Sequence, residues 1–223
     1  MRREAMGRSL CRVAVFFDGG YFDEVSRYYK FQHSRRSRLN VMGVLEFIRH
    51  RVAEREGVAP HLCRIVDAHY FRGRFSTEAA AQAGKLEDER RFDEILMRAG
   101  IAQHYLPVDE SRGRPIEKGI DVLLSLEAYD LAVHKSVDVL ALVACDGDYV
   151  PLVRKLHGIG CRVAVLAWDF QYEYRNGDGE IRRKETRTSS ELKNVCTYLF
   201  DMSDELGRVG PGQDQLIDGV FVV

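Results

Sequence analysis

A nearly unbroken apolar run followed by two acidic residues constrains this chain more than any other feature. The run extends from Val137 to Cys145 and is too short to cross a membrane. Its β-branched valines predict a strand that is buried on both faces. Asp146 and Asp148 follow at once, and helical spacing of apolar residues begins at Tyr149. The sequence therefore places two carboxylates where a buried strand turns into a helix, which is where open α/β sheets bind ligands.

Strands and helices alternate along most of the chain. Further apolar runs predict strands at 12–17, 62–71, 101–106, 161–168 and 195–202. Amphipathic spacing predicts helices at 21–29, 41–55, 77–98, 119–133, 149–156 and 189–194. This alternation predicts an α/β fold of three layers, with a mainly parallel central sheet and helices on both faces. Residues 170–187 break the rhythm, and their alternating aromatic residues predict an inserted hairpin.

Two of these helices carry specific expectations. The segment 119–133 is apolar almost all round, which is typical of a helix buried against a sheet. The segment 77–98 is long and charged, with Leu86, Ile95 and Leu96 expected to face inward. Gly100 is expected to end that helix.

Length and composition favour one domain with a sizeable core, because 45% of the 223 residues are hydrophobic. We expect an N-terminal extension at 1–11, the domain at 12–203 and a C-terminal tail at 204–223. The apolar residues 220–223 leave a dimer contact and a disordered end as alternatives. With neither a signal-peptide pattern nor a membrane-spanning run, and with five cysteines that form no CxxC pair, we expect a cytoplasmic protein that has no membrane partner.

The charges of the chain nearly cancel. Its 33 basic residues face 34 acidic ones, so no net field attracts a polyanion. Binding of a nucleic acid would therefore depend on local basic clusters. Such clusters lie at 35–38, 72–74, 112–118 and 182–187.

Four acidic residues are expected at one edge of the sheet, namely Asp18, Asp121, Asp146 and Asp148. Asp18 ends a strand before two glycines, and Asp121 lies in the first turn of a helix. Because the carboxyl ends of parallel strands share an edge, all four can meet in one crevice, although the sequence does not fix the strand order. Carboxylates held close together favour a bound cation, and oxygen donors suit Mg²⁺ or Mn²⁺. A metal placed there activates water and stabilises a leaving oxygen, which points to hydrolysis of nucleic acid.

Three of these acids also have a structural interpretation. Asp148 can cap the helix that follows it. Asp18 can be a turn residue, and Asp121 can compensate the dipole of its helix.

Four blocks of sequence resemble a known family. They read VAVFFDGGYF, KGIDVLLSLEAYDLA, LVACDGDYVPLVRKLHGIGCRVAVL and SSELKNVCTYLFDM. In order and spacing they are similar to the NYN domain of the PIN-like nuclease superfamily, specifically to its bacterial LabA-like branch, over most of 12–202. The resemblance implies a PIN-like, Rossmann-like fold and a ribonuclease that depends on a divalent metal. The family's acidic positions fall on Asp18, Asp121, Asp146 and Asp148.

Three departures from the family pattern stand beside these acids. The family often has an asparagine where this chain has Tyr21, and it has Ser-Gly where this chain has Ala144-Cys145. A further acid of the middle helix, usually aspartate, is Glu127 here.

Several residues near the acids are expected to contact RNA. Lys118 lies one helical turn before Asp121, where it can neutralise a phosphate. Arg112 and Arg114 in the same loop are expected to reach backbone phosphates, and Tyr21 is assigned to RNA as well. The alternative for Lys118 and the arginines is an ordinary solvated loop. For the aromatic residues of the hairpin, packing against their own sheet is favoured over stacking on RNA.

The sequence thus leaves three functions in order of preference. The first is a metal-dependent ribonuclease that acts on single-stranded RNA or on structured loops, with a homodimer left open. The second is a non-catalytic RNA-binding or regulatory protein on the same fold, which the Tyr21 departure supports. The third is a phosphatase, because the stretch from Asp146 to Val150 fits the DxDxV pattern of haloacid-dehalogenase-like enzymes, in which the first aspartate is a nucleophile. It ranks last because no acidic pair is evident downstream.

Overall fold

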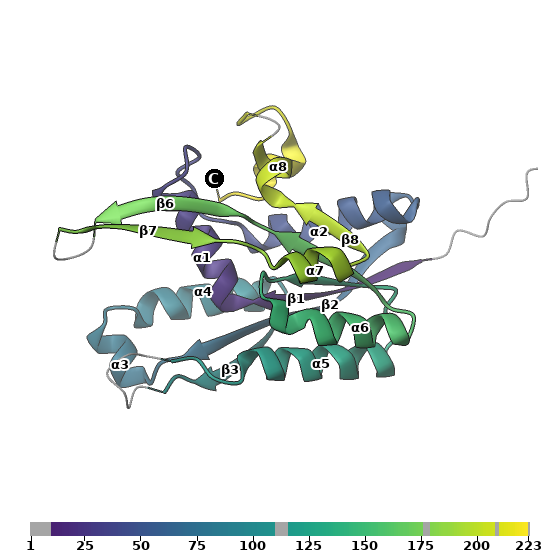
Figure 1. Cartoon of the computed structure of the whole chain (residues 1–223), viewed down its shortest axis with the longest axis horizontal. Coiled ribbons are helices and arrows are strands. Elements are labelled where there is room, and N and C mark those ends of the chain that lie inside the picture. The colour runs from purple at the N-terminus through teal and green to yellow at the C-terminus, as the bar shows by residue number, and fades with distance from the viewer. Residues whose placement is uncertain (1–9, 110–115, 176–178, 208–209, 223) are drawn as a thin grey trace, which may run out of the picture.

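A six-stranded parallel sheet forms the centre of the molecule (Figure 1). The computed structural model describes residues 10–109, 116–175, 179–207 and 210–222. The strands lie in the order β3-β2-β1-β4-β5-β8 and pair in parallel throughout. Their bounds are Cys11–Asp18 for β1, Cys63–Arg74 for β2, Ala102–Pro107 for β3, Val139–Val143 for β4, Arg162–Ala167 for β5 and Tyr198–Asp201 for β8. This confirms the predicted α/β fold with a parallel central sheet.

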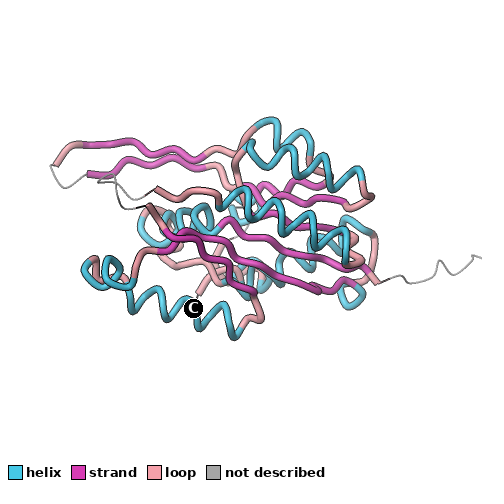
Figure 2. The backbone as a smooth tube through the Cα atoms, turned by 90° about the horizontal axis from the view of Figure 1, so that it is seen from below, coloured by secondary structure: helices cyan, strands magenta, loops and turns pink. Residues whose placement is uncertain are grey.

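Helices cover both faces of the sheet (Figure 2). One face packs against α1 (Gly19–Phe31), α2 (Val41–Glu56), α4 (Leu86–Arg98), α8 (Met202–Gly207) and α9 (Gln215–Gly219). The other face packs against α5 (Ile120–His134), α6 (Val150–Gly158) and α7 (Ser190–Val195). The smaller elements are η1 (Pro60–Leu62), α3 (Thr77–Gln82), η2 (Gly147–Tyr149) and the strands β6 (Phe170–Arg175) and β7 (Ile181–Thr186). Of the described helices, none is long and apolar enough to cross a membrane.

The two faces of β1 contribute side chains to two separate hydrophobic cores. Val13, Val15 and Phe17 pack toward α1 and α2, whereas Ala14 and Phe16 pack toward α5 and α6. All five residues of β4 are buried as well. Alternate side chains of a strand point to opposite faces, so an unbroken apolar run is what a doubly covered strand requires.

The strand order places a topological switch point between β1 and β4. From β1 the chain continues to β2 and β3 on one side, and from β4 it continues to β5 and β8 on the other. Phe17 of β1 lies opposite Val143 of β4, so the loops after these two residues leave the sheet side by side. Open α/β sheets bind their ligands at such a point.

The long helix expected at 77–98 is instead two helices, α3 and α4. Gly84 adopts a left-handed conformation with φ of 65°, which ends the first helix. Gly100 also has a positive φ and follows the end of α4 as expected. Within α4, Leu96 is buried but Ile95 is exposed, so the expected inward position of Ile95 was wrong.

The C-terminal residues pack into the core of their own chain. Val220 and Phe221 are buried, and the Phe221 ring lies 5.1 Å from that of Tyr29. Helix α9 lies directly on α2, where a Cβ on Gly43 would come within 1.7 Å of the Gly219 carbonyl oxygen. For Val220 and Phe221 this contact within the chain replaces both alternatives left open by the sequence, a dimer contact and a disordered end.

Candidate active site

Asp18 joins β1 to α1 at the switch point. It caps α1, because its Oδ1 accepts a hydrogen bond of 3.1 Å from the backbone N–H of Tyr21. A Cβ on the next residue, Gly19, would lie 2.5 Å from the Tyr70 ring and 2.6 Å from the Phe71 carbonyl oxygen. Glycine therefore allows the start of α1 to lie directly on β2, which fixes the carboxylate at the edge of the sheet.

The hydroxyl of Tyr149 joins Asp18 to Asp121. It lies 3.2 Å from Oδ2 of Asp18 and 2.8 Å from Oδ1 of Asp121. Tyr149 is fully buried at the end of η2, and Asp121 stands in the first turn of α5. A phenol carries a single proton, so the two carboxyl groups share one neutral donor. Segments far apart in the sequence thus meet at one pair of acids.

Burial, together with the nearby carboxylates of Asp121 and Glu117, raises the pKa of Asp18 to about 6, although the hydrogen bonds from Tyr21 and Tyr149 oppose this shift. A carboxyl group that is buried among other acids resists ionisation unless a positive charge joins it. The electrostatics of this position therefore favour binding of a cation.

Glu117 is a site residue that the sequence reasoning missed. A Cβ on Gly20 would lie 3.4 Å from Oδ1 of Asp18 and 3.6 Å from Oε2 of Glu117. The bare backbone of Gly20 thus leaves space between the two side chains. Glu117 lies in a loop, whereas the other candidate acids stand at strand ends and helix starts, where sequence pattern marks a site. Its place four residues before Asp121 was the available signal.

Asp146 and Asp148 lie on the turn that follows β4, and both are exposed. Asp146 caps η2, since its Oδ1 accepts a 3.0 Å hydrogen bond from the backbone N–H of Asp148. Helix α6 has no side-chain cap, so the interpretation of Asp148 as a helix cap was wrong. Burial and the charges of Asp18 and Asp146 raise the pKa of Cys145 to about 12. Asp18 and Asp146 therefore both lie near Cys145, at the same edge of the sheet.

The donor set suits a hard divalent cation. Asp18 and Asp121 offer carboxylate oxygens close to one another, with Glu117 beside them. In the described residues, no group of three or more His, Cys, Asp or Glu side chains is arranged to hold a metal ion. Mg²⁺ commonly takes one or two carboxylates and completes its shell with water, and these residues fit that mode.

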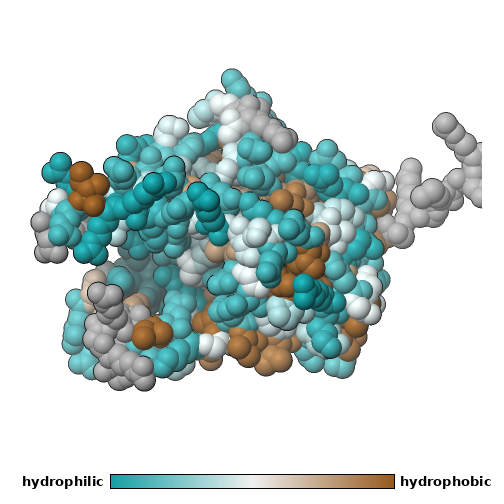
Figure 3. All heavy atoms as spheres, viewed as in Figure 1, coloured by the Kyte–Doolittle hydropathy of each residue, from teal (hydrophilic) through white to brown (hydrophobic). Residues whose placement is uncertain are grey.

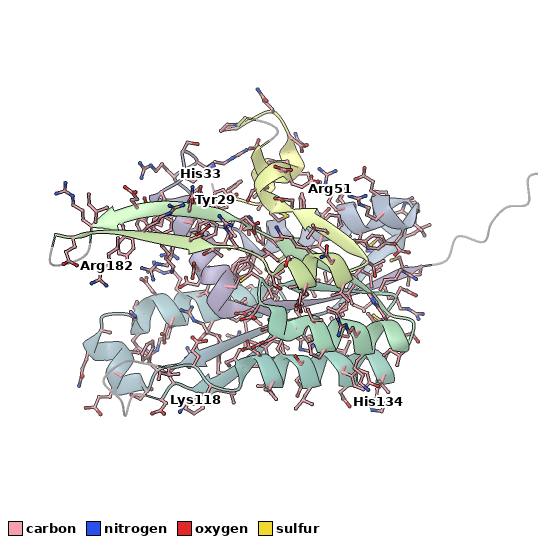
Figure 4. All side chains as sticks on the ribbon, in the orientation of Figure 1. Tyr29, His33, Arg51, Lys118, His134 and Arg182 are labelled. Carbon is pink, nitrogen blue, oxygen red and sulfur yellow. The ribbon has the colours of Figure 1, made fainter. Side chains whose placement is uncertain are left out.

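Three RNA contacts were predicted in the loop before α5, and the structure describes one of them, Lys118. Lys118 is exposed, and its Nζ pairs with Oδ2 of Asp109 at 2.8 Å. Figure 4 shows Lys118 near the start of α5. Arg112 and Arg114 lie outside the described residues.

Tyr21 lies in the core rather than on the surface. Its hydroxyl accepts a 2.7 Å hydrogen bond from the backbone N–H of Trp168 and donates to the carbonyl oxygen of the same residue at 3.2 Å. Burial raises the pKa of this phenol well above its usual value. The phenol of Tyr21 is therefore buried and held by Trp168, which does not leave it free for the RNA contact assigned to it.

The hairpin of β6 and β7 projects from the same edge of the sheet as the acids. Its base is held by Asp169, whose carboxylate pairs with Lys193 at 2.6 Å and accepts a 2.8 Å hydrogen bond from the backbone of Thr188. Near the base, Phe170 stacks on Tyr28 of α1 at 4.2 Å. Phe170 and Tyr172 thus pack on Tyr28 of α1 and also stack on each other within β6.

The outer half of the hairpin presents aromatic and basic side chains together. Tyr172 lies opposite Lys184, and Tyr174 lies opposite Arg182, so the four side chains share one face. Tyr174 and Arg182 are exposed, whereas Lys184 is half-buried and pairs with Glu24 of α1 at 3.0 Å. Figure 3 shows the surface hollowed between the hairpin and the region of α3 and α4. Figure 4 places Arg182 on the hairpin beside this hollow.

Comparisons with known proteins agree with this architecture. The family model described as the NYN domain matches residues 12–203. No curated protein matches the chain in sequence. In fold, the chain is similar to the crystal structure of a protein of unknown function from Vibrio parahaemolyticus RIMD 2210633. That similarity has a TM-score of 0.54 at 18% identity and covers 92% of this chain and 98% of that one.

Proposed function

Because the chain belongs to the NYN domain family, whose members are generally predicted to be nucleases, we propose that it hydrolyses RNA with a divalent metal ion held by Asp18 and Asp121. The observation that carries this proposal is the pair of carboxylates joined by the Tyr149 hydroxyl at the switch point of the sheet. An acid pair at that position suits a bound cation and its phosphate ligand.

Each residue of the site has a distinct part in this proposal. Asp18 and Asp121 would hold the ion, and the Tyr149 hydroxyl, bonded to both, would fix the positions of their carboxylates. Glu117, beside Asp18, accepts a proton from water. When bound, Mg²⁺ or Mn²⁺ supplies activation of that water and stabilises the leaving oxygen. Asp146 and Asp148, exposed on the neighbouring turn, hold water molecules at the edge of the site.

The form of the site favours a single strand of RNA as the substrate. An exposed tyrosine ring stacks on an unpaired base, and a neighbouring arginine or lysine contacts the phosphate. Tyr174 and Arg182 offer this combination on the face that they share. The overall charge of the chain adds no attraction, so these local contacts carry the binding.

The test is cleavage of end-labelled single-stranded RNA and matched DNA in Mg²⁺, Mn²⁺ or EDTA. We expect metal-dependent cleavage of the RNA that falls by at least about 100-fold in Asp121→Asn, because a metal ligand is lost. Asp130→Asn, on an exposed turn of the same helix, is the matched control and should keep full activity. Equal activity in Asp121→Asn and wild type would place the chemistry elsewhere.

A non-catalytic RNA-binding protein is the second candidate. It is favoured by the buried position of Tyr21 and by the exposure of Asp146 and Asp148. In that case RNA is retained but stays intact in every metal, and Asp121→Asn binds it as the wild type does.

A further inference from the structure

Helix α5 has a second apolar face that the described part of the chain leaves exposed. The sequence predicted burial almost all round, but only the face with Ile120, Leu124, Ala128 and Leu131 packs on the sheet. The opposite face is exposed, with exposed fractions of 62% for Val122, 65% for Leu126, 36% for Tyr129 and 49% for Val133. Figure 3 shows apolar side chains gathered along the lower edge of the molecule, where α5 lies in Figure 1.

These four exposed residues, the α5 seam, have the spacing of a helix pair. They follow each other at intervals of four, three and four residues. This is the a and d pattern by which one helix packs along another. A helix that only lies on a sheet needs a single inward stripe, so a second stripe with this period indicates a helical partner.

The two sides of the α5 seam carry opposite charges. Glu127 lies on the side of β3, where its carboxylate acts on His104, and Asp130 follows on the same side of the helix. On the other side lies α6, whose Arg154 and Lys155 are exposed. These bases and Tyr129 line a surface depression of about 570 Å³. The face is therefore acidic along one flank and basic along the other.

We propose that this face binds a second copy of the chain, with the two α5 helices side by side and parallel about a two-fold axis that runs along them. Rotation about that axis places the basic flank of each copy over the acidic flank of the other. Lys155 then meets Asp130 of the second copy, and the reverse contact forms by symmetry. An antiparallel pairing would instead place the two basic flanks opposite each other. Charge complementarity thus favours a second copy as the partner and a parallel direction for the two α5 helices.

The parallel arrangement has a consequence for the candidate active sites. The N-terminal ends of both α5 helices lie at the same end of the dimer, and Asp121 stands in that first turn. Both sites therefore open toward the same side. The dimer does not depend on nuclease activity, and its test is separate.

The first test is the mass of the full chain in solution by light scattering at tens of micromolar. We expect twice the chain mass of 25.5 kDa. Leu126→Glu should raise the dissociation constant at least about 100-fold, because it places a charge in the apolar seam. Met97→Glu changes an equally exposed apolar residue on α4, at 67%, and should leave the dimer intact. A monomeric wild type, or a dimeric Leu126→Glu, would overturn the proposal.

The second test checks the direction of pairing by charge reversal. Lys155→Glu and Asp130→Lys should each weaken the dimer about 10-fold, and the double variant should recover the wild-type dissociation constant. Both positions are exposed, so the variants should keep their circular dichroism spectra. Failure of the double variant to recover would overturn the parallel geometry.

Discussion

The environment of the Asp18 carboxyl group opposes its ionisation. Burial and neighbouring acids raise its pKa from 3.8 to about 6. A group whose pKa rises on folding stabilises the fold below its unfolded pKa, and this contribution is lost as the pH rises through the folded pKa. At pH 7 the ionised carboxylate therefore costs about 2 to 3 kcal/mol when no cation is bound.

Asp18→Asn should remove this cost while keeping the helix cap, because asparagine caps as well as aspartate. We expect the melting temperature of the metal-free protein to rise by about 5 to 10 °C at pH 7.5 and much less at pH 4. Thermal melts at the two pH values measure the difference. Equal shifts at both values would show that ionisation of Asp18 is not the source.

Gly20 leaves the space beside Asp18 and Glu117 that a methyl group would fill. It lies in the first turn of α1 without a positive φ, so Gly20→Ala should raise stability by up to about 1 kcal/mol. The same methyl should block the ion and its waters. We expect a higher melting temperature without metal, together with loss of the further rise that Mn²⁺ gives the wild type. A rise with Mn²⁺ equal to that of the wild type would show that the ion does not use this space.

At the scale of elements, the β6–β7 hairpin carries exposed aromatic and basic side chains at the edge of the sheet where the acids lie. Tyr174→Ala and Arg182→Ala should each weaken binding of single-stranded RNA by about 5-fold or more, because stacking or a phosphate contact is lost. Fluorescence anisotropy in EDTA measures binding without cleavage. Ile181→Ala is the control, since Ile181 lies opposite Arg175 on the other face of the hairpin. Equal affinity in all three variants would remove the hairpin from the binding surface.

Elements that depend on local pattern could be predicted from the sequence, and those that depend on distant contacts could not. The apolar run predicts the buried strand β4, and Gly100 predicts the end of α4. The break at Gly84 was missed because good helix formers, alanines before it and charged residues after it, continue a helical pattern across it. The place of β1 beside β4 follows from pairing between distant segments, which no local pattern records.

The candidate site shows the same division. The positions of Asp18 and Asp121 at the strand end and the helix start were predicted, but the Tyr149 hydroxyl that joins them was not. An apolar aromatic residue after a turn has the same pattern whether or not its hydroxyl reaches an acid. Tyr21 was placed wrongly for a related reason, because sequence spacing does not show to which side a ring turns.

At the scale of the whole molecule, β1 and β4 diverge at one point, and the acids gather there. Three segments of the chain, at the end of β1, at the start of α5 and after β4, meet at that edge. The central claim is that this convergence holds a divalent metal ion between Asp18 and Asp121.

Anomalous diffraction from crystals of the protein grown with Mn²⁺ tests this claim most directly. We predict a peak at about 2.0 to 2.2 Å from carboxylate oxygens of both Asp18 and Asp121, a distance typical of a small divalent ion. The peak should be lost in Asp121→Asn. A peak confined to Asp146 and Asp148, or density at the switch point that carries no anomalous signal, would contradict the account.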